Sequence, residues 1–340
     1  MSASREFIER IPKSDLHLHL DGSLRLPTLV DLARAQGVRL PAWDEAGLRR
    51  LVFKSHYSDL TEYLKGFAYT TAVMQTPEAL ERVGYELAQD NQAEGVRYIE
   101  VRFAPQLHQN ARMDCIDVLA ALDRGLRRAK EEFNSRPAVR QGGEPPFEYG
   151  IIACAMRMFG KGFSAYFDQL LDVHAHSERK WVFSLASVEL VRAAVEARDK
   201  LGLPIVGFDL AGAEAGYPAG DHAQAYALAH KNFLKKTVHA GEAYGPESIF
   251  QAITDLHADR LGHAVYLFDE GMIKSPDIKD KKAYVANLVQ FIADRRITIE
   301  VCLTSNLQTI PAIRDLSRHS FRRMRKAKLS ATFCTDNRTV

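Results

Sequence analysis

Two histidines near the start of the chain are spaced so that both could bind one metal ion. His17 and His19 lie in residues 14–22, which read SDLHLHLDG. In an extended strand, successive side chains point to opposite faces, so the two imidazoles share one face and the three leucines share the other. Two imidazoles side by side supply half of a tetrahedral metal site. The run therefore predicts a metal-binding strand; the alternative is a surface strand that carries two histidines by chance.

The composition limits the classes of protein to consider. Of the 340 residues, 46% are hydrophobic and 26% charged, as in a soluble globular protein. The net charge of +2, from 45 basic and 43 acidic residues, gives no electrostatic reason to expect nucleic acid or an anionic membrane as a partner. Residues 1–10 are too charged for a secretory signal, and no apolar run approaches the roughly 18 residues of a membrane span. Four widely separated cysteines favour reduced thiols in a cytoplasmic protein.

Short apolar runs alternate with helical patterns along the chain, which indicates a parallel sheet. Eight such units predict an α/β fold, a (β/α)8 TIM barrel, in a single domain over residues 1–340. An open doubly wound sheet is the alternative, but no glycine-rich phosphate loop follows the first strand. The expected strands are residues 14–20, 95–103, 147–156, 203–210, 236–239, 260–263, 297–302 and 329–334. The expected helices include residues 77–94, 115–133, 187–200 and 280–295.

Three insertions interrupt this pattern. The first, residues 40–75, carries four apolar side chains spaced as on an amphipathic helix, which is either an ordinary packing helix or a lid over a site. These side chains are Leu60, Tyr63, Leu64 and Phe67. Residues 134–146 and 269–280 predict surface loops. The chain stops four residues after Asp336, where a helix normally follows an eighth barrel strand, so we expect either a truncated chain or an unusual closure.

Polar, titratable residues gather where the expected strands end. In TIM barrels the active site lies at the C-terminal ends of the strands, so these residues should meet. They are His17, His19 and Asp21 after the first strand, residues 209–214 after the fourth, His239 and Glu242 after the fifth, His263 after the sixth, residues 302–306 after the seventh, and Asp336 and Asn337 after the eighth.

Three of these imidazoles and one carboxylate suit a catalytic zinc ion. Such zinc takes about three protein ligands and keeps one position for a water molecule, whose pKa it lowers to roughly 7. Glu242 could act as a general acid, and His263 with Asp336 could orient the water and take its proton. A two-metal hydrolase on this fold would usually need a lysine at the end of strand four, and residues 205–212 contain none. This favours one zinc ion per chain. The candidate ligands are His17, His19, His239 and Asp336.

Together, five segments resemble the adenosine deaminase family. They are DLHLHLDG at 15–22, DLAGAE at 209–214, HAGE at 239–242, GH at 262–263 and TD at 335–336. The resemblance spans nearly the whole chain, in the family's order and approximate spacing. It implies zinc-dependent hydrolytic deamination of a 6-aminopurine nucleoside. Adenosine would be converted to inosine, or deoxyadenosine to deoxyinosine, with release of ammonia. A small purine nucleoside is then the expected partner, and the sequence does not indicate the oligomeric state.

The resemblance also implies a role for each matched residue. The four candidate ligands would bind zinc, and hydroxide on zinc would attack C6 of the purine. Glu242 would protonate N1, while His263 and Asp336 would hold the attacking water. The substrate contacts would be Asp21 to a ribose hydroxyl, the backbone of Gly212 to the purine N3 edge, and an apolar gate formed by Leu60, Tyr63, Leu64 and Phe67.

Asn337 departs from the family pattern, in which many relatives carry an aspartate that faces purine N7. Since N7 is an acceptor, an aspartate must be protonated to donate to it, whereas asparagine always carries amide donors. The contact can therefore survive with an altered substrate preference. Relatives also act on free adenine or on adenosines with larger 5′ groups such as aminodeoxyfutalosine, and Asp21 favours a nucleoside over free adenine.

Two other classes of protein remain as alternatives. A barrel that binds a nucleoside without turning it over is disfavoured by the intact ligand set and by Glu242. A zinc-dependent esterase or phosphotriesterase-like hydrolase is disfavoured by the missing lysine, and the number of bound metal ions would distinguish it.

Overall fold

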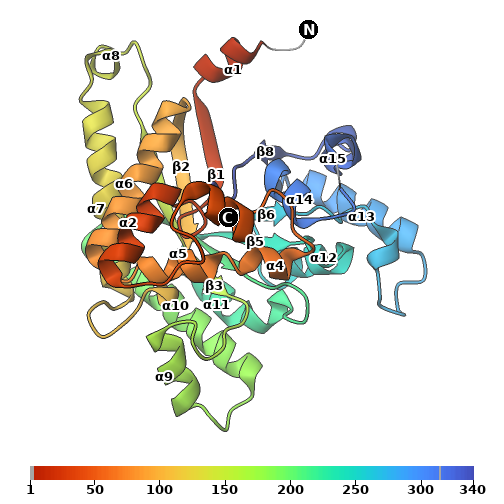
Figure 1. The fold of residues 1–340 in the computed structure, drawn as a ribbon. Helices are drawn as coiled ribbons and strands as arrows, with labels where there is room; N and C mark the ends of the chain where they lie inside the picture. The colour runs from red at the N-terminus through yellow and green to blue at the C-terminus, as the bar shows by residue number, and fades with distance from the viewer. Residues whose placement is uncertain (1–3, 314) are drawn as a thin grey trace.

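The strands form a nearly closed ring in the order of the sequence. The computed structural model describes residues 4–313 and 315–340. Its eight strands form one sheet ordered β1 to β8, every paired neighbour is parallel, and helices surround the strands (Figure 1). This confirms the (β/α)8 barrel and excludes the doubly wound sheet, whose strand order reverses. The strands are β1 (Lys13–His19), β2 (Val96–Phe103), β3 (Glu148–Met156), β4 (Ile205–Ala211), β5 (Lys235–Ala240), β6 (Arg260–His263), β7 (Thr298–Val301) and β8 (Ala331–Phe333).

Helices connect and flank these strands. The expected helices are present, but α10 begins at Arg179, before the expected start at Ser187, because Val182, Phe183 and Ala186 extend its buried stripe. Within residues 4–313 and 315–340, no helix is long and apolar enough to cross a membrane. The α-helices are α1 (Arg5–Arg10), α2 (Leu26–Gln36), α3 (Glu45–Leu51), α4 (Leu60–Leu64), α5 (Phe67–Val73), α6 (Pro77–Ala93), α7 (Cys115–Asn134), α8 (Pro137–Arg140), α9 (Ala165–Val173), α10 (Arg179–Leu201), α11 (Ala223–Lys231), α12 (Pro246–Thr254), α13 (Lys281–Asp294), α14 (Leu303–Thr309) and α15 (Phe321–Lys326).

The region 40–75 folds as three short helices, so the prediction of one amphipathic helix there was wrong. Leu60 and Tyr63 lie on α4, whereas Phe67 begins α5. The break falls at Gly66, where an added Cβ would lie only 3.0 Å from Val340 and 3.3 Å from Phe53. The two predicted loops are also not wholly irregular, because 134–146 contains α8 and 269–280 contains a 3-10 turn.

The barrel closes through a single residue that follows β8. The described part of the chain shows no ladder between β8 and β1, but an isolated parallel bridge pairs Asp336 with Leu18. The backbone N–H of Asp336 donates to His17 O, and that of His19 donates to Asp336 O, each at 2.8 Å. Asp336 has a φ of 68°, in the left-handed region. This seam fixes the segment after β8 against the end of β1.

A buried arginine ties together strands on different sides of the barrel. Arg102 on β2 is fully buried and donates to Asp209 Oδ2 on β4 and to Glu300 Oε2 on β7, each at 2.9 Å. It also donates to Leu16 O on β1 at 2.6 Å. Arg260 on β6 adds a second cation, 2.7 Å from Glu300 Oε1. Because an unpaired buried charge is costly, each of these groups depends on the others.

Replacing Arg102 by methionine should destabilise the barrel strongly. The carboxylates of Asp209 and Glu300 would stay buried with one cation fewer, and breaking a buried ion pair costs about 3–5 kcal/mol. Arg124→Met is the matched control, because Arg124 is half-exposed at its 3.2 Å pair with Glu81, and exposed pairs contribute about 0–1 kcal/mol. Urea unfolding followed by circular dichroism measures both variants. Equal losses in the free energy of unfolding would contradict the structural role of Arg102.

Candidate active site

The four candidate metal ligands meet at the C-terminal ends of β1 and β5 and in the segment after β8. All four residues are buried, and their ligand atoms lie within 4.8 Å of one another. Asp336 Oδ1 lies 3.4 Å from His17 Nε2 and 3.5 Å from His19 Nε2. His19 Nε2 lies 3.2 Å from His239 Nε2. The spacing of the motifs therefore brings this set together as expected.

This set of donor atoms fits a divalent metal ion such as zinc. His17 Nε2 is buried and makes no hydrogen bond to any residue that the structure describes. The opposite ring nitrogens are held by carboxylates: His17 Nδ1 lies 2.8 Å from Glu300 Oε2, and His239 Nδ1 lies 3.0 Å from Asp209 Oδ2. Such carboxylates fix the tautomer and the orientation of metal-binding histidines. Imidazole nitrogens with a carboxylate oxygen are the ligands that catalytic zinc takes.

The charges around the ligand group favour a cation at its centre. Burial and Arg102 lower the pKa of His17, but contacts with Asp336 and Glu300 outweigh them and raise it to about 9. Burial lowers the pKa of His19 well below its usual value, and the neighbouring cationic groups lower it further. One positive charge is thus stabilised among the ligands, and a second on a neighbouring ring is not.

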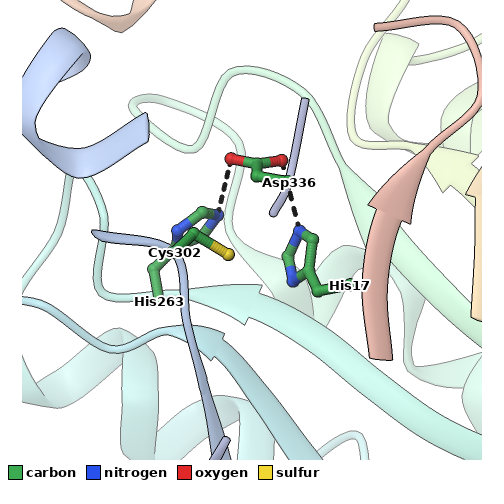
Figure 2. A group of neighbouring side chains, drawn as sticks. All are labelled: His17, His263, Cys302 and Asp336. Carbon is green, nitrogen blue, oxygen red and sulfur yellow. Dashed lines mark ion pairs between the residues drawn. The ribbon is translucent and has the colours of Figure 1, made fainter. Parts of the chain in front are cut away.

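A second group of possible ligands overlaps the first. It consists of His17, His263, Cys302 and Asp336, whose ligand atoms also lie within 4.8 Å of one another. Figure 2 shows the Asp336 carboxylate between the two histidines, with one oxygen toward each. Asp336 Oδ2 lies 3.9 Å from His263 Nε2. Cys302 is fully buried, and burial raises the pKa of its thiol well above the usual value.

The loop after β5 holds Glu242 beside His263. The carboxylate of Glu214 accepts hydrogen bonds at 2.6–3.1 Å from four successive backbone N–H groups, those of residues 241–244. Glu242 Oε2 lies 3.9 Å from His263 Nε2. Burial, with the negative charges of Asp336 and Glu214, raises the pKa of Glu242 to about 8. Its carboxyl group therefore carries a proton at neutral pH.

Asp21 lies beside the metal-ligand group, and Gly212 directly follows β4. Asp21 is buried with Oδ1 3.9 Å from His19 Nδ1, and this oxygen accepts no hydrogen bond within the described ranges. Burial raises the pKa of Asp21 to about 7. Gly212 follows β4 with a φ of 102°, which favours glycine. The contacts of both residues with substrate stay predictions.

The predicted gate residues divide into two pairs. Leu60 lines a cavity of about 250 Å³ that Glu242 also lines. Tyr63 is 3% exposed, and burial raises the pKa of its hydroxyl well above the usual value, with the charges of Asp336 and Glu242 adding to the effect. The second pair, Leu64 and Phe67, packs against the hydrophobic core, as the first pair also does. Leu60 and Tyr63 are linked to site residues by the cavity and by these charges, and a gate formed by all four side chains stays a prediction.

The side-chain amide of Asn337 is committed to neighbours within the protein. Its nitrogen donates to Asp336 Oδ1 at 2.9 Å and to the Tyr63 hydroxyl. Because an ionised carboxylate can only accept, the nitrogen must face Asp336. A Cβ on Gly22 would lie 1.5 Å from Asn337 Oδ1, so the amide occupies space that only glycine leaves. A contact with purine N7 stays a prediction, and it would require one of these amide hydrogens to be released.

Sequence reasoning missed the buried charges that support the ligands. Arg102 and Glu300 were read only as parts of apolar strands, and Asp209 and Glu214 were placed at the end of the fourth strand without a role. The available signal was a charged residue inside an otherwise apolar run, as in VRYIEVRF and TIEV.

The chain is similar to known proteins over nearly its whole length. A sequence profile described as adenosine deaminase matches residues 12–340. An adenosine deaminase of Mycobacterium marinum is 37% identical over 335 residues, which cover 98% of this chain and 82% of that protein. One of Mycolicibacterium vanbaalenii is 38% identical over 335 residues, with the same coverage.

The solved structure of arabidopsis ADAL complexed with GMP shares 26% identity and a TM-score of 0.71, over 98% of this chain and 82% of that one. An adenine deaminase from Arthrobacter aurescens, at 23% identity and a TM-score of 0.70 over 96% of this chain and 82% of that one, shares the fold. Because the profile spans nearly the whole chain and the curated relatives exceed 30% identity, the chain belongs to the adenosine deaminase family.

Proposed function

We propose that this protein is a zinc-dependent deaminase that converts adenosine and water to inosine and ammonia. The observation that carries the proposal is the buried convergence of three imidazoles and one carboxylate beside the protonated carboxyl group of Glu242. Hydrolytic removal of an amino group from a purine requires an activated water and an acid. The substrate class is supported by the curated relatives at 37% and 38% identity, which are named adenosine deaminases.

The four converging ligands would hold one zinc ion. Bound zinc would lower the pKa of its water to roughly 7, which makes hydroxide available at neutral pH. Glu300 and Asp209 orient the rings of His17 and His239 through their Nδ1 atoms. Arg102 bonds to both carboxylates and keeps them ionised.

Glu242 supplies the proton that the purine ring needs. As the water oxygen bonds to C6, the electron pair of the C6–N1 double bond moves to N1, and the Glu242 carboxyl group donates its proton there. The C6–amino bond then breaks, and the protons of the water end on the departing ammonia and on Glu242. The Glu214 clamp on the backbone of residues 241–244 keeps the acid in place.

His263 and Asp336 face the space in which the water must lie. His263 Nε2 is 3.9 Å from Asp336 Oδ2 and 3.9 Å from Glu242 Oε2. Burial lowers the pKa of His263 to about 3, so the ring is neutral. These two side chains would orient the attacking water.

Asp21 favours a ribose hydroxyl over a phosphate group. Its buried oxygen Oδ1 can accept a hydrogen bond from a hydroxyl, whereas a phosphate would bring a second negative charge into the same space. A nucleotide such as AMP is the second candidate substrate, because the related arabidopsis structure holds GMP. Adenine and aminodeoxyfutalosine are the further candidate substrates.

Glu242→Gln should abolish most of the activity without loss of metal. Glutamine keeps the shape of the side chain but cannot donate a carboxyl proton, and general acid catalysis contributes roughly 10²–10⁴-fold. We expect kcat for adenosine to fall by that factor, while the metal content measured by mass spectrometry is unchanged. Glu270→Gln, at an exposed position, is the control. Full activity of E242Q would reject the assigned role.

Removal of the metal should stop the reaction reversibly. After dialysis against a chelator we expect no deamination, and one equivalent of zinc should restore it, since the ligand atoms form one compact group. Metal analysis against protein concentration provides the stoichiometry. A requirement for two equivalents would favour the two-metal hydrolase class, and activity in the chelated protein would contradict a metal-dependent mechanism.

The ultraviolet spectrum tests the substrate directly. Adenosine should change to the spectrum of inosine. Because burial raises the pKa of Asp21 to about 7, its carboxyl group is largely ionised at about pH 8 and repels a phosphate, so we expect kcat/KM for adenosine to exceed that for AMP at that pH. Asp21→Asn should reduce this ratio of kcat/KM values because it removes the negative charge. Faster turnover of AMP, adenine or aminodeoxyfutalosine than of adenosine would replace adenosine as the substrate.

A further inference from the structure

A chain of hydrogen bonds connects His263 to a backbone amide outside the site. The backbone N–H of Phe321 donates to His319 Nδ1 at 3.0 Å. His319 Nε2 lies 3.1 Å from Asn306 Oδ1, and Asn306 Nδ2 lies 3.1 Å from His263 Nδ1. The three side chains are 3%, 0% and 1% exposed, in the order His319, Asn306, His263. Because these side chains are buried, solvent water does not compete for the hydrogen bonds between them.

The direction of every bond in this chain follows from its first donor. A backbone N–H can only donate, so Nδ1 of His319 accepts and the ring proton lies on Nε2. That proton faces Asn306, whose oxygen must accept it, and this turns the amide nitrogen toward His263. Nδ1 of His263 then accepts in turn, and its ring proton must lie on Nε2. Each Nδ1 thus accepts a hydrogen bond and carries no proton, so each ring holds its proton on Nε2.

We propose that His319 and Asn306 hold His263 in the tautomer with its proton on Nε2, so that His263 donates a hydrogen bond to the attacking oxygen and does not take its proton. Nε2 points at the space between Asp336 Oδ2 and Glu242 Oε2, as Figure 2 shows for Asp336. A fixed donor there stabilises the negative charge on the attacking oxygen. The part played by the oxygen rests on the proposed function; the tautomer rests on the hydrogen bonds alone.

His319 and Asn306 are thus positioning residues that act through His263. The seventh strand leads into α14, where Asn306 lies in the first two turns, and His319 precedes α15. His263 has a φ of 65°, so its backbone is also held in an uncommon conformation. The ring is fixed from both its backbone and its Nδ1 atom.

Asn306→Asp tests this assignment, because it replaces only the side-chain NH2 group with an oxygen atom. A carboxylate can only accept, so the proton of His263 must move to Nδ1. In zinc-loaded protein labelled with 15N-histidine, we expect the wild-type His263 signals to show a protonated Nε2 and an unprotonated Nδ1. In N306D, Nδ1 should be protonated. The signals are assigned with His263→Gln.

The kinetic effect should appear in kcat. A histidine held in the wrong tautomer lowers kcat of a serine protease by about 10⁴. We expect N306D to lower kcat for adenosine by roughly 10²–10⁴-fold with KM changed less than about 3-fold. Asn232→Asp is the matched control, because Asn232 donates to Leu228 O on α11, and it should leave both the signals and kcat unchanged.

Variants at His319 keep the test independent of the folding of N306D. His319→Gln retains an amide donor toward Asn306 and should preserve the tautomer, whereas His319→Leu should yield a mixture of both. A wild-type His263 protonated on Nδ1, or unchanged His263 signals in both N306D and H319L, would overturn the proposal. The expected tautomer in a protein that does not deaminate adenosine would reject the proposed function and support this inference.

Discussion

One backbone pairing, between the end of β1 and Asp336, closes the barrel and assembles the metal ligands in the same step. Asp336 exchanges backbone hydrogen bonds with His17 and His19, and the side chains of the same three residues face one another. The left-handed conformation of Asp336 costs about 1–3 kcal/mol, which this pairing must offset. Closure of the barrel and formation of the site therefore cannot be separated energetically.

The buried charges around this seam alternate in sign. Glu300 and Asp209 each lie between a histidine Nδ1 and the guanidinium of Arg102. The arginine stabilises both carboxylates as anions, and each anion accepts a hydrogen bond from an imidazole whose other nitrogen faces the metal group. The residue that stabilises the middle of the barrel thus also determines how the metal-binding rings are oriented.

The features that the sequence predicted correctly follow from local rules. Alternation along β1 places His17 and His19 on one face, and parallel strands in a barrel end at one edge. The buried network was not predictable, because a charged residue in an apolar strand, such as Arg102, does not reveal its partner across the barrel. The break between α4 and α5 was missed as well: Gly66, at the break, packs against Val340 from the far end of the chain, a contact that the local pattern does not show.

Two asparagines give the site a direction that carboxylates could not provide. An amide has one donor end and one acceptor end, so Asn306 transmits the orientation of His319 to His263. Asn337 uses its donor end on Asp336 Oδ1, the oxygen that faces the metal group. An aspartate at 337 would bring two carboxylates together at that point, and one of them would have to hold a proton. Asparagine supplies the donor without that proton, so the charge of the ligand group does not depend on a second titrating carboxylate.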